Sequence, residues 1–294
     1  MTADYLVSFP GLGIGPLEIN RVAFSIGSLD VYWYGLLIAF ATILSFVLAL
    51  QQRKRYGFKE DDVLDLFLVL IPTMLIGARL YYVAFAWDHF ADNPAQIFNL
   101  RDGGLAFYGG VIGAILGIAI LASAKNIHAF VYYDYLAPYV PLAQGIGRWG
   151  NFFNQEAFGV NTDLPWGMIS NGTKQYLEYA NLSGVDPNLP VHPTFFYEFL
   201  GNMVIAIILF YLRRKNPPRD TVTFTYLGLY GLLRFFVEGL RTDALFIGNT
   251  SLRISQVLSL VMMVSAILYF VITRFTSLKP PRAFACNADS DADT

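Results

Sequence analysis

The chain has 294 residues with a formal net charge of -2, and 55% of the residues are hydrophobic, 16% aromatic and only 14% charged. A soluble domain of this length normally carries about 25% charged residues, and the mean hydropathy of +0.47 also excludes that class. The single cysteine, Cys286, excludes a disulfide framework. The histidines lack metal-ligand spacing, so we expect no metal. We also expect no organic cofactor and no nucleic-acid partner. The composition predicts an all-α polytopic membrane protein.

Residues 1–30 contain several glycines and prolines, and we expect them to form an outer segment with a short interfacial helix. About seven apolar segments then follow, each near the length of about 20 residues that spans a bilayer. These transmembrane helices are predicted at residues 31–50, 63–85, 105–124, 131–152, 194–212, 221–239 and 254–273. Pro138 and Pro141 should kink the fourth helix. On the third helix, Gly109, Gly113 and Gly117 form a stripe that favours close helix packing.

Two polar segments complete the predicted organisation. Residues 154–193, between spans 4 and 5, should form a small extracytoplasmic loop domain with little regular structure. Residues 279–294 are predicted to be a disordered cytoplasmic tail. Most lysines and arginines of the loops fall on one side of this topology, so the positive-inside rule places the N-terminus outside and the C-terminus in the cytoplasm. The whole chain, 1–294, is expected to be one transmembrane catalytic domain.

A lone arginine in the fourth apolar segment is the first candidate functional residue. Arg148 is followed at helical spacing by Asn151 and Asn154, which would share its face. A charged residue at membrane depth is costly and is usually functional, and a guanidinium group beside amides suits a phosphate or carboxylate. The alternative is that Arg148 only neutralises a buried acid such as Glu198 or Glu238.

The sixth segment carries a second polar stripe. Tyr230, Arg234, Glu238 and Arg241 follow one another at intervals of four, four and three, so they form one line on a helix. Because Arg148 and Arg234 lie toward the outer halves of their helices, together they could hold the phosphate of a lipid headgroup. The alternative is an Arg234–Glu238 pair that only neutralises itself.

These motifs resemble the prolipoprotein diacylglyceryl transferase family. The strongest part is residues 145–159, GIGRWGNFFNQEAFG. Supporting matches are Trp33-Tyr34-Gly35, Gly77-Ala78-Arg79, Asp102-Gly103-Gly104, Gly109-Gly110, His192-Pro193 with Tyr197-Glu198, and the stripe from Tyr230 to Arg241. The resemblance covers nearly the whole chain.

The resemblance implies a function and a location. The enzymes transfer the diacylglyceryl group of phosphatidylglycerol to the lipobox cysteine in the signal peptide of a prolipoprotein. A thioether forms and glycerol phosphate leaves, as the first step of lipoprotein maturation. We therefore expect a multi-pass protein of the bacterial cytoplasmic (inner) membrane whose partners are this phospholipid, the precursor peptide and other membrane lipids.

The resemblance also implies site residues. Arg148, Arg234, Tyr108 and Glu238 are the expected catalytic residues. The expected phosphatidylglycerol-binding residues are Arg148, Asn151, Tyr34, Asn154, Glu156, Gly159, Tyr230 and Arg241. Positive donors are needed here because the departing oxygen carries the phosphate charge.

One position departs from the family pattern. Some members have Phe-His-Gly-Gly where this chain has Phe107-Tyr108-Gly109-Gly110, and that histidine has been proposed as the base. A tyrosine is ordinarily a poor base at neutral pH. Three possibilities stay open: arginines activate Tyr108, another group such as Glu238 takes the proton, or the cysteine is activated electrostatically, which we favour.

Two other classes of protein compete with the transferase interpretation. Arg148 and Arg234 could be the anion site of a transporter for anionic lipids, although the halves of the sequence show no inverted repeat. They could also belong to a non-catalytic lipid-binding protein. Turnover of phosphatidylglycerol separates the enzyme from both.

Overall fold

The structure is a computed structural model that describes residues 6–99, 103–248, 250–276, 280–282 and 284. The chain divides into two compact units, which are described separately. The first unit comprises residues 1–45, 137–217 and 221–280, and the second comprises residues 46–136, 218–220 and 281–294. The N-terminal helix α1 (Trp33–Gln52) contributes residues to both units.

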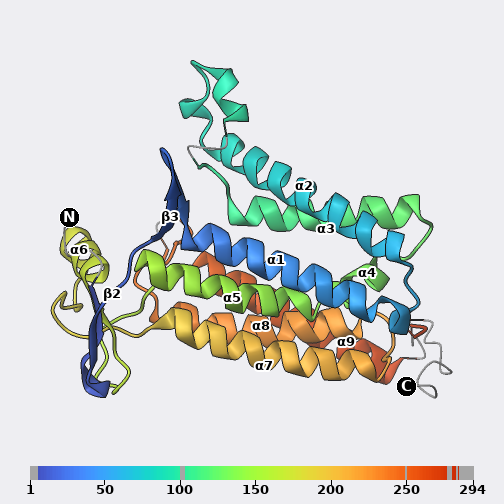
Figure 1. Ribbon diagram of the computed structural model, residues 1–294. Coiled ribbons are helices and arrows are strands. Elements are labelled where there is room, and N and C mark those ends of the chain that lie inside the picture. The colour runs from blue at the N-terminus through green and yellow to red at the C-terminus, as the bar shows by residue number, and fades with distance from the viewer. Residues whose placement is uncertain (1–5, 100–102, 249, 277–279, 283, 285–294) are drawn as a thin grey trace. The chain divides into compact units, whose positions relative to one another are not determined.

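Helices dominate the described chain (Figure 1). The long ones besides α1 are α2 (Glu60–Phe85), α3 (Phe107–Ala124), α7 (Thr194–Arg214), α8 (Thr221–Leu240) and α9 (Ile254–Phe275). Shorter helices are α4 (Ala129–Leu136), α5 (Tyr139–Asn154) and α6 (Asn171–Ala180), with single 3-10 turns η1 (Pro10–Leu12), η2 (Arg53–Tyr56), η3 (Trp87–His89) and η4 (Pro94–Phe98). The predicted helical membrane architecture is therefore confirmed.

Five helices in the described part of the chain are long and apolar enough to cross a membrane: α1 with the turn after it, α2, α3, α7 and α9. The other two predicted spans, the fourth and the sixth, are not among these five. The fourth is broken next to Pro138 into α4 and α5, so the expected kink is a break between two helices. The sixth, α8, carries Arg234 and Glu238. A total of seven spans stays a prediction.

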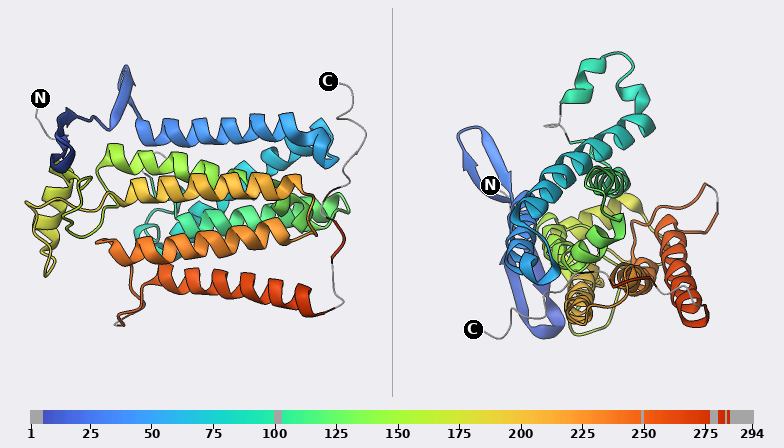
Figure 2. Two further views of the ribbon diagram at one scale, coloured as in Figure 1. Left: turned by 90° about the horizontal axis from the view of Figure 1, so that it is seen from below. Right: turned by 90° about the vertical axis from the view of Figure 1, so that its right-hand side faces the viewer.

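The first unit contains a row of helices in which α5 packs on α7, α7 on α8, and α8 on α9. Figure 2 shows α7, α8 and α9 running side by side. Small strands lie near the end of α5 and the start of α7 (Figure 1). They are β1 (Leu6–Phe9), β2 (Ile14–Glu18), β3 (Val22–Ile26), β4 (Leu29–Tyr32) and β5 (Ile169–Ser170). The strands therefore lie beside the end of α5 and the start of α7, where these helices meet the polar loops.

The strands correct two expectations. The described part of residues 1–30 forms strands instead of the expected interfacial helix, and β1 pairs antiparallel with both β2 and β5. The β3 and β4 strands form a separate hairpin in which Ile26 pairs with Leu29. Residues 154–193 also contain more regular structure than predicted, since they include β5 and the ten-residue α6.

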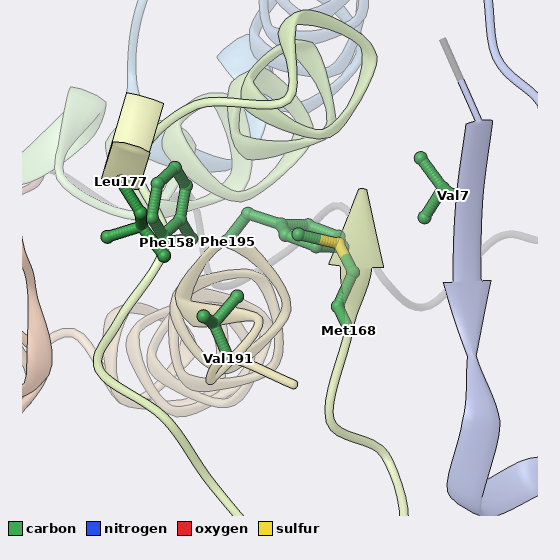
Figure 3. Close-up of a cluster of buried hydrophobic side chains, with 6 residues drawn as sticks. All are labelled: Val7, Phe158, Met168, Leu177, Val191 and Phe195. Atoms are coloured by element: carbon green, nitrogen blue, oxygen red, sulfur yellow. The ribbon is translucent and has the colours of Figure 1, made fainter. Parts of the chain in front are cut away.

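A small apolar core fixes this polar part of the first unit. Val7 of β1, Met168 before β5 and Phe195 of α7 are each at most 3% exposed and belong to one cluster. Figure 3 shows the cluster, whose other members are Phe158, Leu177 and Val191. Burial of these apolar side chains removes them from water, which is the main favourable contribution to folding. The core therefore ties the loop after α5 to the start of α7.

The second unit is built on α2 and α3, which pack side by side and run antiparallel (Figure 1). The predicted glycine stripe is confirmed as a close contact: a Cβ atom on Gly113 would lie 2.1 Å from the carbonyl oxygen of Thr73. A Cβ atom on Gly109 would likewise lie 2.3 Å from the carbonyl oxygen of Gly77. Most of the predicted tail at 279–294 lies outside the described residues, but Phe284 is buried against Tyr56.

Candidate functional site

The polar face of α5 forms as the sequence predicts. Because the helix continues to Asn154, Arg148, Asn151 and Asn154 share one side of it. The guanidinium Nη1 of Arg148 donates to Asn151 Oδ1 at 3.3 Å. The amide groups of Asn151 and Asn154 both donate to Glu156 Oε1, at 3.0 and 3.1 Å. Arg148, Asn151, Asn154 and Glu156 therefore form one network of side-chain hydrogen bonds.

The turn that ends α5 brings Glu156 back toward this network of side chains. Gln155 adopts a left-handed backbone conformation with a φ of 54°, which ends the helix. Its side-chain Oε1 accepts a hydrogen bond from the backbone N–H of Gly172 in α6 at 2.6 Å. The backbone N–H of Glu156 in turn donates to the carbonyl of Asn151 at 3.0 Å. The loop after α5 therefore holds the Glu156 carboxylate over its own helix.

The α8 stripe also forms as predicted, with pairs along the helix. Arg234 Nη2 lies 2.5 Å from Glu238 Oε2. At the end of the helix, the Arg241 guanidinium binds the Asp243 carboxylate through two hydrogen bonds of 2.8 and 2.6 Å. The hydroxyl of Tyr230 interacts with the guanidinium of Arg148, so the α8 stripe faces the α5 stripe.

Glu198 of α7 connects the two stripes. Its Oε2 lies 2.5 Å from Arg148 Nη2 and its Oε1 lies 2.6 Å from Arg234 Nη1. Arg241 Nη1 is 4.0 Å from the same Oε1. The contact with Arg148 is an ion pair without hydrogen-bond geometry. We call these groups, Arg148, Arg234, Arg241, Glu198, Glu238 and Asp243, the arginine cluster.

Glu198 and Asp243 were not among the predicted site residues. The sequence did contain a signal for Glu198, because it was considered as a buried partner of Arg148, and the structure contains that ion pair. The Arg234–Glu238 pair considered above also forms, but both of its members reach beyond it: Arg234 to Glu198, and the Glu238 carbonyl to Arg253. Asp243 had no sequence signal, because a carboxylate in a polar loop is ordinary.

Tyr34 and Gly159 border the cluster. The Tyr34 ring packs on Gly150 so closely that a Cβ atom there would lie 1.8 Å from Tyr34 Cδ2. Tyr34 is also near enough to interact electrostatically with Arg148 and Glu156. The backbone of Gly159 pairs with that of Arg241 and donates to the carbonyl of His192 at 2.9 Å. A side chain at 159 would meet His192 and Leu240, so only glycine fits this crossing.

Burial within the cluster is uneven. The side chains of Glu198 and Glu238 are 2% exposed, whereas those of Arg148, Arg234 and Arg241 are 21%, 15% and 13% exposed. Two buried carboxylates therefore hold Arg148 and Arg234, while Arg241 is held by Asp243, whose side chain is 32% exposed. Although burial acts to raise it, the hydrogen bonds from Arg241 hold the pKa of Asp243 below its usual value. Such an arrangement can bind an anion without first having to order its donors.

One predicted catalytic residue belongs to the other unit. Tyr108 lies at the start of α3 in the second unit, whereas every other predicted site residue lies in the first. Among the described residues, no group of three or more histidine, cysteine or acidic side chains could hold a metal ion. The cluster itself offers guanidinium donors and carboxylates.

Comparison with known proteins identifies relatives over most of the chain. Residues 21–272 match the family described as prolipoprotein diacylglyceryl transferase. The phosphatidylglycerol–prolipoprotein diacylglyceryl transferase of Clostridioides difficile (strain 630) is 44% identical over 253 residues, which cover 86% of this chain and 95% of that protein. The enzymes of the same name from Finegoldia magna and Bacillus cereus (strain G9842) are 40% and 41% identical, over 85% and 87% of this chain and 94% and 93% of theirs.

Proposed function

The chain belongs to the prolipoprotein diacylglyceryl transferase family, and we propose that this membrane protein transfers the diacylglyceryl group of phosphatidylglycerol to a prolipoprotein. The acceptor is the thiol of the lipobox cysteine in the precursor's signal peptide. The reaction is the first step of lipoprotein maturation. The observation that carries the assignment to a site is the arginine cluster, in which Glu198 brings guanidinium groups of α5 and α8 together.

The reaction makes clear demands on that site. The cysteine sulfur forms a bond to the terminal glycerol carbon of the diacylglycerol, and the bond from that carbon to the phosphate oxygen breaks. The electron pair of the broken bond leaves with glycerol phosphate, while the thiol proton goes to a base or to solvent. Arg148 and Arg234 are the proposed donors to the phosphate, because both are held by Glu198 and their side chains are partly accessible.

The surrounding residues have proposed roles in holding the phospholipid. Asn151, Asn154 and Glu156 are linked to Arg148 by hydrogen bonds and could meet the hydroxyl groups of the glycerol headgroup. Tyr34 of α1 and Tyr230 of α8 border the cluster, and Arg241 belongs to it. Gly159 keeps the crossing between the loop and α8 narrow. Glu238 fixes Arg234 along α8.

The orientation in the membrane is part of the proposal. The protein would lie in the bacterial cytoplasmic membrane with its N-terminus outside and its C-terminus in the cytoplasm, as the distribution of lysine and arginine predicts. The arginine cluster would then face the outer leaflet, where the signal peptide of an exported precursor is accessible. The seven spans, the single catalytic domain and the extracytoplasmic assignment of residues 154–193 belong to the same proposal.

The decisive experiment uses purified protein in detergent, phosphatidylglycerol labelled in its headgroup, and a peptide with a lipobox cysteine. We expect release of labelled glycerol phosphate and a peptide mass increased by one diacylglyceryl group. Arg148→Ala should lower the rate by about a hundredfold or more, because it removes a donor to the leaving group. Bound phosphatidylglycerol without turnover would instead support lipid binding or transport.

The base that accepts the thiol proton is tested by Tyr108→Phe. If the cysteine is activated electrostatically, as we propose, this variant retains activity within about twofold of the parent, because ring packing is kept and only the hydroxyl is lost. Initial rates measured at several pH values check the expectation. A hundredfold loss that cannot be traced to unfolding would assign the proton transfer to Tyr108.

A further inference from the structure

The arginine cluster contains as many acidic as basic groups. Arg148, Arg234 and Arg241 face Glu198, Glu238 and Asp243, so the formal charges of the six side chains cancel. A phosphate group that binds there adds negative charge to a site that is already neutral. An anion buried without a matching positive charge is costly, so the acidic partners limit how tightly the site can hold phosphate.

Glu198 is the acid with the widest reach. It contacts all three arginines and comes from α7, whereas Glu238 and Asp243 each pair with one arginine near them in sequence. Among the residues that the structure describes, it is also the one acid that forms an ion pair with Arg148. If its charge were removed, Arg234 and Arg241 would keep Glu238 and Asp243, but Arg148 would keep only neutral partners.

The position of Glu198 suits a fixed partner that the phosphate does not displace. Its side chain is 2% exposed, whereas the side chains of the three arginines are 13 to 21% exposed. A phosphate group can therefore reach the arginines more readily than it can reach Glu198. The buried carboxylate both aligns the guanidinium groups and offsets their charge.

We propose that Glu198 is a positioning residue that sets the phosphate affinity of the arginine cluster low enough for glycerol phosphate to leave. The product carries more negative charge than the phosphodiester of the substrate, so a site with excess positive charge would hold the product more tightly than the substrate. By keeping the cluster neutral, Glu198 favours release after each turnover. This inference rests on the proposed function for its substrate and product.

The test is Glu198→Gln, which keeps the size of the side chain and removes its charge. The dissociation constant of glycerol phosphate, and separately of inorganic phosphate, is measured by calorimetry on the full-length protein in detergent. We expect both ligands to bind Glu198→Gln about tenfold more tightly than they bind the parent, because the positive charge of Arg148 is then no longer compensated. Turnover should fall, with stronger inhibition by added glycerol phosphate.

A purely structural role for Glu198 gives the opposite sign. If the carboxylate only holds the arginines in place, Glu198→Gln lets them separate, and both ligands bind more weakly or equally well. That result would overturn the proposal. Glu178→Gln is the matched control, because Glu178 has a 55% exposed side chain in α6, outside the cluster, and its loss should change neither affinity nor turnover.

A second variant covers the case in which Glu198→Gln does not fold. Glu198→Asp keeps the charge on a shorter side chain, so glycerol phosphate affinity should stay within about threefold of the parent while turnover falls through poorer alignment. Loss of affinity in Glu198→Asp would contradict the proposal. These binding measurements need no transfer reaction, so parent protein that binds glycerol phosphate but modifies no peptide would refute the proposed function and leave the role of Glu198 to be judged on affinity alone.

Discussion

Two arginine sites in apolar helices of this protein satisfy their donors in different ways. Arg79 of α2, in the second unit, is 8% exposed and uses all five of its N–H donors on backbone carbonyl groups. The acceptors are the carbonyl oxygens of Gln96, Ile97, Asn99, Gly103 and Gly104, at 2.7 to 3.0 Å. Arg148 and Arg234 of the first unit instead bind carboxylates and an amide, and their side chains are partly accessible.

We propose that this difference in acceptors separates a structural arginine from arginines that bind a ligand. A guanidinium group saturated by backbone carbonyls has no donor left for a ligand, so Arg79 organises the segment after α2. Carboxylate partners hold an arginine from one side and let other donors face a substrate. An arginine in an apolar helix therefore predicts a polar environment, but its partners decide whether that environment serves the fold or the chemistry.

The largest effect should come from Arg234→Lys. A lysine is a single point charge and cannot bridge Glu198 and Glu238 as the two terminal nitrogens of Arg234 do, at 2.6 and 2.5 Å. We expect transfer to fall by about a hundredfold, measured as initial rate with labelled phosphatidylglycerol. Arg55→Lys, at an exposed arginine, is the control and should be neutral. Full activity of Arg234→Lys would show that charge alone suffices.

Arg79→Ala should act on stability. It leaves five carbonyl groups without their donor, and such losses cost about 1–3 kcal/mol for each buried group that water cannot reach. We expect the free energy of unfolding to fall by about 3 kcal/mol or more, followed as thermal unfolding in detergent. Limited proteolysis should cut residues 86–106 first. An unchanged melting temperature would mean that the carbonyls find other partners without cost.

A pair of neighbouring glycines separates the crowding around Arg79 from backbone strain. Gly103 and Gly104 have positive φ angles of 80° and 75°, so alanine strains the backbone at both. A Cβ atom on Gly104 would lie 2.4 Å from Arg79 Nη1 and 2.8 Å from Tyr82 Cε1, whereas one on Gly103 meets no atom within 4 Å. Gly104→Ala should therefore destabilise the protein by about 1–2 kcal/mol more than Gly103→Ala does. Equal melting temperatures would show that Arg79 and Tyr82 make room for the methyl group without cost.

Acid should act on the arginine cluster and not on the Arg79 site, because backbone carbonyls do not titrate. The pKa of Asp243 is lower in the folded protein than its usual value, so the unfolded chain binds the proton more readily. The stabilisation by Asp243 is then present above about pH 4 and is lost as the pH falls through the folded pKa. Between pH 6 and pH 3, the parent should lose more stability than Asp243→Asn, measured as thermal unfolding at each pH. Parallel pH profiles for the two proteins would contradict this assignment.

Local sequence properties determined the helices and both polar stripes. For six of the seven predicted spans, both the first and the last residue fall within three residues of the bounds of one observed helix. The exception is the fourth, where Pro138 separates α4 and α5. Helical periodicity alone brings Asn151 and Asn154 beside Arg148, and Glu238 beside Arg234. These features depend on neighbours within two helical turns, so the sequence carries their full signal.

Tertiary structure decided the rest, because it depends on partners far apart in the chain. The β1 strand exists through pairing with β2 and with the distant β5, which no local pattern announces. Arg79 in an apolar helix is explained only by carbonyls 17 to 25 residues away. Glu198 lies 50 residues from Arg148 and 36 from Arg234. The sequence supplies these charges, and only the packing of α7 against α5 and α8 brings them together.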